Sequence, residues 1–170
     1  MTEKDNVEVH IKYKDIDKTL TASSAEQAWL ILEKIFSDFM PSFEIAKKLW
    51  LDIDVTALAK DTEGIIAFSP EGPNVLVPKG KLTDNETLIL WLLASYLGHK
   101  LGRIQTDSLT KDELQAKLGK SGKITSTRLG ELIKNSTVTK ADEDRYRITT
   151  FGVAQLQKDT LPKIRAKAST

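Results

Sequence analysis

The N-terminal part of the chain has the alternating pattern of a hairpin, followed by the periodicity of a helix. Apolar residues occupy every second position from Val7 to Tyr13, which predicts a β-strand with one buried face. The alternation resumes over 16–21, after the polar Lys14-Asp15 corner, so a second strand should pair antiparallel with the first. Serines and the capping-box spacing at 23–27 then precede apolar residues at helical spacing, which predicts a helix ending at Met40-Pro41.

The middle of the chain combines a second hairpin with a strongly apolar helix. Two β-rich runs, 64–68 and 74–77, flank a dense set of turn residues over 69–73, and this predicts the hairpin. Thr83 and Glu86 have capping-box spacing ahead of a helix that is apolar on nearly every side and ends near 98–102. Such a helix should be buried and shared by the parts of the chain on either side of it.

From Leu109 to Ile164 the pattern predicts helix, turn, helix, hairpin and helix. Thr110 and Glu113 have capping-box spacing, and Gly119 should end the first of these helices. The second helix is predicted over 123–134, and the hairpin follows it. On a 100° wheel the second helix has an apolar stripe and an opposite polar face. The stripe contains Ile124, Leu129, Leu132 and Ile133, and the opposite face contains Lys123, Thr127, Gly130, Glu131 and Lys134.

Charge is divided unevenly between the two halves of the chain. Residues 1–97 hold 10 Lys and Arg against 16 Asp and Glu, whereas residues 98–170 hold 15 against 8. A basic half suits an anionic polymer, which an acidic half would repel. The order of the predicted elements indicates an α+β protein with an N-terminal α+β domain over 1–82 and a second domain over 83–170 that includes the central helix.

Composition excludes several classes of protein. The chain has 170 residues and no cysteine, so disulfides, thiolate metal sites and cysteine nucleophiles are excluded. Its N-terminus is polar, and its longest apolar run, Leu88 to Ala94, is far shorter than a membrane span of ~20 residues. These features predict a cytoplasmic protein with no membrane partner. Most aromatic residues have core-like positions, and we expect a core role for Trp29, Phe36, Phe39, Phe43, Trp50 and Trp91.

Catalytic and metal-binding patterns are weak. His10 and His99 have no second histidine or carboxylate at ligand spacing, and both are expected to be ordinary surface or helix-end residues. The acidic pairs Asp15/Asp17 and Asp52/Asp54 are more simply explained as solvated residues near turns. The glycines at 119–122 lack the spacing of a phosphate-binding loop. The sequence therefore predicts no enzyme, no metal and no cofactor.

Several segments together carry a resemblance to a known family. They read Leu-Thr-Lys-Asp-Glu-Leu at 109–114, Gly-Lys-Ser at 119–121, Ile-Thr-Ser-Thr-Arg-Leu-Gly-Glu-Leu-Ile-Lys at 124–134 and Tyr-Arg-Ile-Thr-Thr-Phe-Gly at 146–152. In this order they resemble the winged-helix superfamily of prokaryotic transcription regulators. The resemblance implies a helix-turn-helix whose second helix enters the DNA major groove. The whole chain also resembles small archaeal proteins in which a strand-strand-helix unit precedes a winged helix, and that resemblance implies no activity.

The resemblance assigns recognition-helix positions to Ser126, Thr127 and Arg128, and Arg128 has the fork that reads guanine. The sequence departs from the usual basic wing because the tip at 141–144 is acidic and would repel phosphate. The full set of candidate DNA-contacting residues is Lys120, Lys123, Ser126, Thr127, Arg128, Lys134, Lys140, Arg145 and Arg147.

The expected function is DNA binding, as a transcriptional regulator or a chromatin-associated factor. A homodimer, for which the strand from Val7 to Tyr13 offers an edge, would match two DNA half-sites. Two alternatives remain open. The winged helix could be a protein-interaction or scaffolding module that binds a protein partner, since fold alone does not separate these uses. A regulator that senses a small molecule between the two halves is the third reading.

Overall fold

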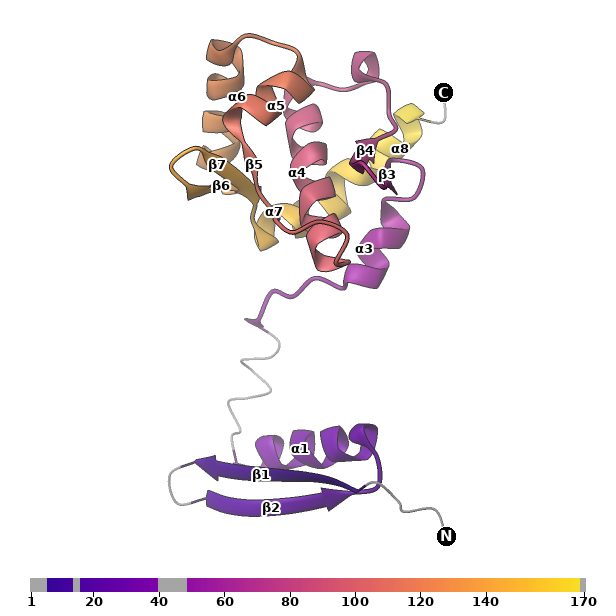
Figure 1. The fold of residues 1–170 in the computed structure, drawn as a ribbon, viewed down its shortest axis with the longest axis vertical. Helices are drawn as coiled ribbons and strands as arrows, with labels where there is room; N and C mark the ends of the chain where they lie inside the picture. The colour runs from indigo at the N-terminus through magenta and orange to yellow at the C-terminus, as the bar shows by residue number, and fades with distance from the viewer. Residues whose placement is uncertain (1–5, 14–15, 40–48, 169–170) are drawn as a thin grey trace. The chain divides into compact units, whose positions relative to one another are not determined.

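The chain folds into two compact units (Figure 1), unit 1 over Met1–Trp50 and unit 2 over Leu51–Thr170. The computed structural model describes residues 6–13, 16–39 and 49–168. Both units mix helices and strands, which confirms the predicted α+β class. The division lies after Trp50, whereas the sequence suggested a boundary after Leu82. The reason is that residues 51–82 supply a helix and a hairpin, which pack on the central helix of unit 2.

Unit 1 is a hairpin covered by one helix. Strands β1 (Val7–Tyr13) and β2 (Ile16–Ala22) pair antiparallel, with Val7 opposite Ala22. Helix α1 (Ala25–Phe39) contacts both strands. Its N-terminus is capped because the Ser24 hydroxyl accepts a hydrogen bond from the Gln27 amide at 3.2 Å. The predicted strand-strand-helix order is confirmed, and the predicted stop at Met40-Pro41 lies outside the described residues.

The core of unit 1 is thin. Among its described residues only Ala22 and Ala28 are buried apolar residues, and Val7, Val9 and Ile11 are half-buried. The prediction that Trp29 is a core residue is wrong, because 69% of its surface is exposed at the edge of the α1 apolar stripe. A unit this small buries only a limited fraction of its surface, and this ring remains largely uncovered.

The other predictions of aromatic core residues have different outcomes. The prediction for Trp50 is also wrong, since 78% of its surface is exposed. Phe36 is half-buried, and so is Trp91, whose ring lies 4.0 Å from the Lys117 ammonium in a cation–π contact. The side chains of Phe39 and Phe43 lie outside the described part of the chain.

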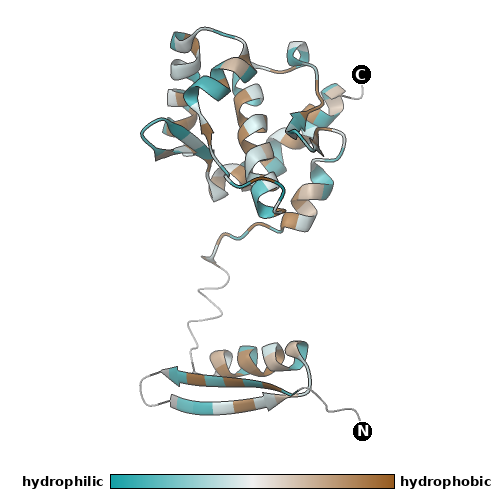
Figure 2. Cartoon of the chain, in the orientation of Figure 1, coloured by the Kyte–Doolittle hydropathy of each residue, from teal (hydrophilic) through white to brown (hydrophobic). Residues whose placement is uncertain are grey.

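Unit 2 is built around helix α4 (Asp84–Lys100), which carries hydrophobic residues along most of its length (Figure 2). Leu88, Leu90, Leu92 and Leu93 are fully buried. The predicted capping box is present, because the Thr83 hydroxyl accepts from the Glu86 amide at 3.2 Å and the Glu86 carboxylate accepts from the Thr83 amide at 2.8 Å. A helix that is apolar all round must be covered on all sides.

Part of this cover comes from the residues before α4. They form α3 (Val55–Asp61), the antiparallel pair β3 (Ile66–Ser69) and β4 (Gly72–Val75), and a short 3₁₀ turn, η1 (Lys79–Lys81). The predicted second hairpin is thereby confirmed.

The rest of the cover comes from the residues after α4, and it has the predicted order of elements. These are β5 (Leu109–Thr110), α5 (Lys111–Leu118), α6 (Gly122–Lys134), β6 (Val138–Asp142) and β7 (Arg145–Ile148). The three strands form one antiparallel sheet in the order β5-β7-β6. The capping box at Thr110 and the left-handed Gly119 at the end of α5 are both present.

A three-part helical segment closes unit 2. Helix α7 (Thr150–Gln155) continues through a π-helical segment, η2 (Leu156–Thr160), into α8 (Leu161–Ala168). Leu156, Leu161 and Ile164 from this segment join the core around α4. None of the helices in the described ranges combines the length and the apolar character that crossing a membrane requires.

Two glycines of unit 2 differ sharply in the space around them, and their alanine variants form a matched pair. A Cβ on Gly152 would overlap the carbonyl oxygen of Thr137, which is fixed by hydrogen bonds from Thr149. A Cβ on Gly130 meets nothing. We expect Gly152→Ala to lower the unfolding free energy by about 2 kcal/mol or more. Gly130→Ala should raise it by about 0.5–1 kcal/mol.

Hydrogen exchange of the α4 amides reports the stability of unit 2 in the full chain. Equal protection of α4 in both variants would contradict the close approach of Gly152 to the Thr137 carbonyl.

The Glu86 carboxylate links α4 to α8 through an ion pair with Lys167 at 2.7 Å. Burial raises its pKa, but hydrogen bonds from Lys167 and Thr83 outweigh burial and hold the pKa below the ordinary 4.5. Ionised Glu86 therefore stabilises the fold above pH 4.5, and this stabilisation is lost as the pH falls through the lowered value.

We accordingly expect Glu86→Gln to cost about 1 kcal/mol at neutral pH, and less in acid. Urea unfolding at neutral pH and in acid measures the unfolding free energies of the variant and the wild type. Glu63→Gln, at an exposed position, is the control. A cost that is the same at both pH values would exclude a role for the charge.

Candidate nucleic-acid interface

Helix α6 packs on the rest of unit 2 through a narrow buried face. Thr125, Leu129 and Leu132 are buried. The predicted apolar stripe is only partly buried, because Ile124 and Ile133 are 40% and 37% exposed. Thr125 takes a buried position instead, and its hydroxyl is satisfied by donating to the Ser121 carbonyl at 3.1 Å.

The opposite face of α6 is exposed, as the helical wheel predicted. We call Lys123, Thr127, Gly130 and Lys134 the α6 stripe; all four are exposed and lie along one side of the helix. Lys120 is exposed on the turn before α6. Glu131, predicted on the same face, is instead half-buried at its side. The α6 stripe therefore carries two ammonium groups and no acidic group.

Arg128 is partly exposed, but two carboxylates bind its guanidinium group. Its Nη1 donates to Glu131 Oε1 at 2.9 Å, and its Nε donates to Asp84 Oδ2 at 3.4 Å. The hydrogen bond to Glu131 and the negative charge of Glu131 raise the pKa of the guanidinium further. Asp84 belongs to the first turn of α4, so this contact joins two helices that the sequence pattern treats separately.

Glu131 is bound from two sides. The Asn85 amide donates to its Oε2 at 3.1 Å, in addition to the bond from Arg128. These hydrogen bonds, the one from Asn85 first, hold the pKa of Glu131 below its ordinary value. The negative charge that should oppose DNA docking is therefore compensated locally by Arg128.

The hydroxyls of Ser126 and Thr127 are engaged within α6. Ser126 Oγ donates to the Gly122 carbonyl at 2.8 Å, and Thr127 Oγ1 donates to the Lys123 carbonyl at 3.0 Å. Both residues are exposed. To donate to a phosphate, each hydroxyl must first rotate away from its carbonyl.

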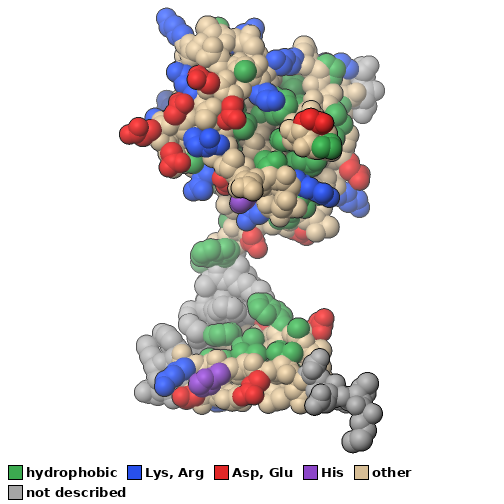
Figure 3. All heavy atoms as spheres, viewed as in Figure 1, with side chains coloured by type: hydrophobic (Ala, Val, Ile, Leu, Met, Phe, Trp, Pro, Cys, Tyr) green, Lys and Arg blue, Asp and Glu red, His purple; other side chains and the backbone are tan. Residues whose placement is uncertain are grey.

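The three candidate residues of the β6–β7 hairpin have different environments. Arg145 is structural, because its Nε donates to Ser108 Oγ at 2.9 Å and its Nη2 to the Ser108 carbonyl at 2.7 Å. Arg147 is half exposed and lies 3.8 Å from an Asp107 carboxylate oxygen. Lys140 is exposed. The tip at 142–144 is acidic and exposed, and acidic side chains lie among basic ones over this face (Figure 3).

The structure adds a lysine that the sequence pattern did not indicate. Lys79 of η1 and Lys120 of the α5–α6 turn line the same open hollow of about 450 Å³. The Lys79 ammonium lies 3.3 Å from the point where a Cβ on residue 119 would be. Because the two lysines come from distant parts of the chain, periodicity and spacing gave no signal of their proximity.

The division into units reduces the charge asymmetry. Unit 2 holds 18 Lys and Arg against 15 Asp and Glu, and unit 1 holds 7 against 9. The acidic residues of 51–97 belong to the same unit as the basic C-terminal half. Electrostatic support for anion binding is therefore local to α6 and its flanks.

Other polar side chains that sequence analysis considered as candidate sites make structural contacts instead. Asp54 caps α3 by accepting from the Thr56 and Ala57 amides, and Asp52 accepts from the Ile53 amide. His10 Nε2 lies 2.6 Å from Asp17 Oδ1 across the first hairpin. Within the part of the chain that the structure describes, no group of three or more histidine and acidic side chains could hold a metal ion.

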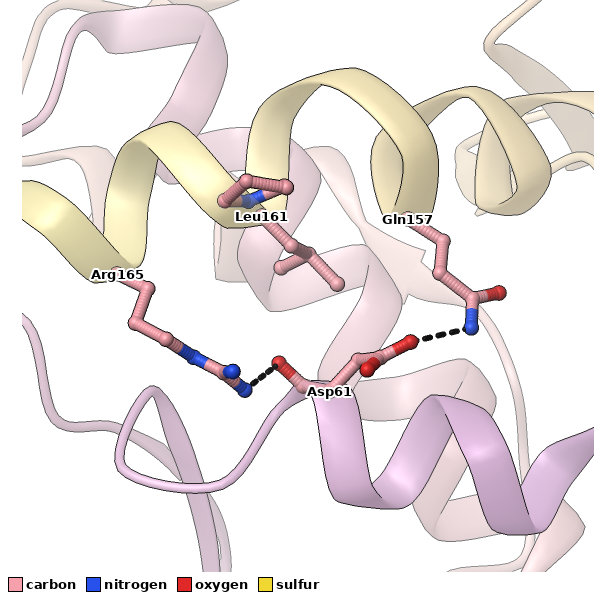
Figure 4. Close-up of a pocket in the computed structure, with 5 residues that line it drawn as sticks. Asp61, Gln157, Leu161 and Arg165 are labelled. Carbon is pink, nitrogen blue, oxygen red and sulfur yellow. Dashed lines mark hydrogen bonds between the residues drawn. The ribbon is translucent and has the colours of Figure 1, made fainter.

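A shallow pocket between α3 and the closing helices is also structural (Figure 4). Gln157 donates to the Asp61 carboxylate at 2.5 Å, and Arg165 donates to the Asp61 carbonyl at 2.7 Å. The polar groups in this hollow thus bind one another. They tie α3 to the C-terminal helices.

Comparison of the chain with protein-family models, with curated proteins and with solved structures finds no match.

Arg145 and Arg147 lie on the same strand and give a matched test of the structural assignment. Lysine cannot reproduce the two bonds that Arg145 makes to Ser108. We expect Arg145→Lys to lower the unfolding free energy of unit 2 by about 1–2 kcal/mol. Arg147→Lys should change it by less than about 0.5 kcal/mol, because this side chain is exposed. Urea unfolding measures both, and equal effects would contradict the assignment.

Proposed function

We propose that unit 2 binds double-stranded DNA and that residues 109–155 act as a winged helix-turn-helix. In this proposal α5 and α6 are its two helices, and β6 and β7 form the wing. The order of the elements, the tight turn at Gly119 and the exposed outer face of α6 support it. The α6 stripe is the contact surface.

One observation carries the proposal. The α6 stripe presents Lys123 and Lys134 with Lys120 on the adjoining turn, while the one acidic residue of α6, Glu131, is paired with Arg128. A helix face with cations, whose neighbouring anion is paired with an arginine, is suited to a phosphate backbone. Gly130, with open space around it, allows that backbone to approach closely.

The same geometry favours binding to phosphates over reading of bases. Arg128 would have to leave both Asp84 and Glu131 before it could reach a guanine. Ser126 and Thr127 would have to break bonds to backbone carbonyls. We therefore favour a chromatin-associated factor with little sequence preference over a sequence-specific transcriptional regulator.

A second candidate is a protein-interaction module. The acidic tip at 142–144 and the exposed ring of Phe151 on α7, half of whose surface is accessible, favour it. A basic protein partner would suit the tip, which repels DNA. Failure of the purified chain to bind duplex DNA at low salt would favour this candidate.

A salt series tests the α6 stripe directly. Each phosphate contact contributes about 0.9 to the slope of log K against log salt concentration. We expect the double variant Lys123→Ala and Lys134→Ala to bind a random duplex more weakly and to lower the magnitude of that slope by about 1.8. Fluorescence anisotropy of a labelled duplex measures both quantities.

The matched control is the double variant Lys158→Ala and Lys163→Ala, which removes the same charge from exposed positions of η2 and α8. It should retain the wild-type slope. Equal losses in the two double variants would show attraction to net charge alone, and the α6 stripe would then be excluded as the contact surface.

A further inference from the structure

Unit 1 leaves its apolar face incompletely covered. Val9 and Ile11 of β1 are half-buried, and Trp29 and Leu30 of α1 are 69% and 64% exposed. Among the described residues of the unit only Ala22 and Ala28 are buried apolar residues, and a unit this small buries a low fraction of the surface that its unfolded chain exposes. Additional cover over its apolar side chains would stabilise it.

We propose that a second copy of this chain supplies the cover. In this arrangement β1 of one chain pairs antiparallel with β1 of the other, centred on His10, and the two hairpins form one four-stranded sheet. This inference goes beyond DNA binding and does not rest on it.

The two edges of the hairpin differ. Among the described residues β1 and β2 pair with each other alone, so each has an open edge. On the face toward α1, β2 carries Lys18 opposite Ile11. A charge on the inner face of an edge strand opposes further pairing. The corresponding face of β1 carries Val7, Val9 and Ile11, so β1 is the edge suited to a partner.

The backbone of β1 is placed for this pairing. The ladder ends with Tyr13 opposite Ile16, and residues that flank so short a connection hydrogen-bond to each other. Alternation along the antiparallel ladder then turns the N–H and C=O groups of Glu8, His10 and Lys12 toward the open edge. A second β1 centred on His10 offers the same three residues in reverse order.

The charges of β1 match this register. Glu8 and Lys12 are exposed on the outer face, two residues on either side of His10. Antiparallel pairing about His10 places Glu8 of each chain opposite Lys12 of the other, so two opposite-charge pairs form. On the inner face, Val9 meets Ile11. A parallel in-register pair would instead set like charges side by side.

The width of the hairpin suits the helices. Helix α1 contacts both β1 and β2. Strands lie about 4.8 Å apart, so each hairpin occupies about 10 Å of the joint sheet. Two α1 helices on the same face would then lie about 10 Å apart, which is the distance of direct helix packing.

Two charge variants test the register in the full chain without DNA. Glu8→Lys sets its new ammonium group opposite Lys12 of the other chain, and Lys12→Glu sets its new carboxylate opposite Glu8 of the other chain. Because like charges then face each other in both pairs, each variant alone should dimerise at least about tenfold more weakly than wild type. An equimolar mixture of the two variants sets opposite charges in both pairs. We expect the mixture to form a heterodimer with a dissociation constant within about threefold of the wild-type value.

Sedimentation equilibrium over a concentration series gives the dissociation constants. Glu63→Lys makes the same charge change as Glu8→Lys at an exposed position of unit 2. This control variant should dimerise as wild type does. Protection of the Val9 and Ile11 amides, which face β2, in each variant would show that the hairpin is intact. A wild-type chain that is monomeric at all concentrations would overturn the proposal. A mixture that stays monomeric, or variants as tight as wild type, would overturn the His10-centred register.

Discussion

The burial of α4 is the constraint on which unit 2 depends. A helix that presents leucines on nearly every side is stable only when several elements surround it, and no short neighbouring segment can do this alone. Residues 51–82 and 109–164 both contribute to its cover. This explains why the compact unit begins at Leu51: a boundary after Leu82 would strip α4 of α3, β3 and β4.

Local signals in the sequence were sufficient for most of the secondary structure. The capping boxes at Thr83 and Thr110, the stop at Gly119 and the alternation from Val7 to Tyr13 act between residues a few positions apart, and the structure has each of them. The exposed face of α6 follows from the same local periodicity. The burial of Trp29 was mispredicted because periodicity gives the direction of a side chain but does not show whether anything lies there to cover it.

The candidate site was less predictable because some of its polar contacts are non-local. Arg128 is held by Asp84, a residue of another helix, and Arg145 by Ser108, which precedes the sheet. Neither partner has a sequence signature. Two arginines, Arg128 and Arg145, therefore support the fold, while the lysines of the α6 stripe remain exposed. Arginine's fork favours the former role, and the longer reach of a solvated ammonium suits the latter.

The hydrogen bonds of Asp61 have a further consequence for how unit 2 is made. They join α3 to Gln157 and Arg165, whose positions are 96 and 104 residues later in the chain. A ribosome releases α4 before α8, so the apolar surface that Leu161 and Ile164 finally cover is open while the later elements are still being synthesised. Contacts of such separation also slow folding, because the intervening chain must be ordered before they form. Unit 2 is therefore expected to complete its folding only after its C-terminal helix has left the ribosome, and to be most prone to aggregation until then.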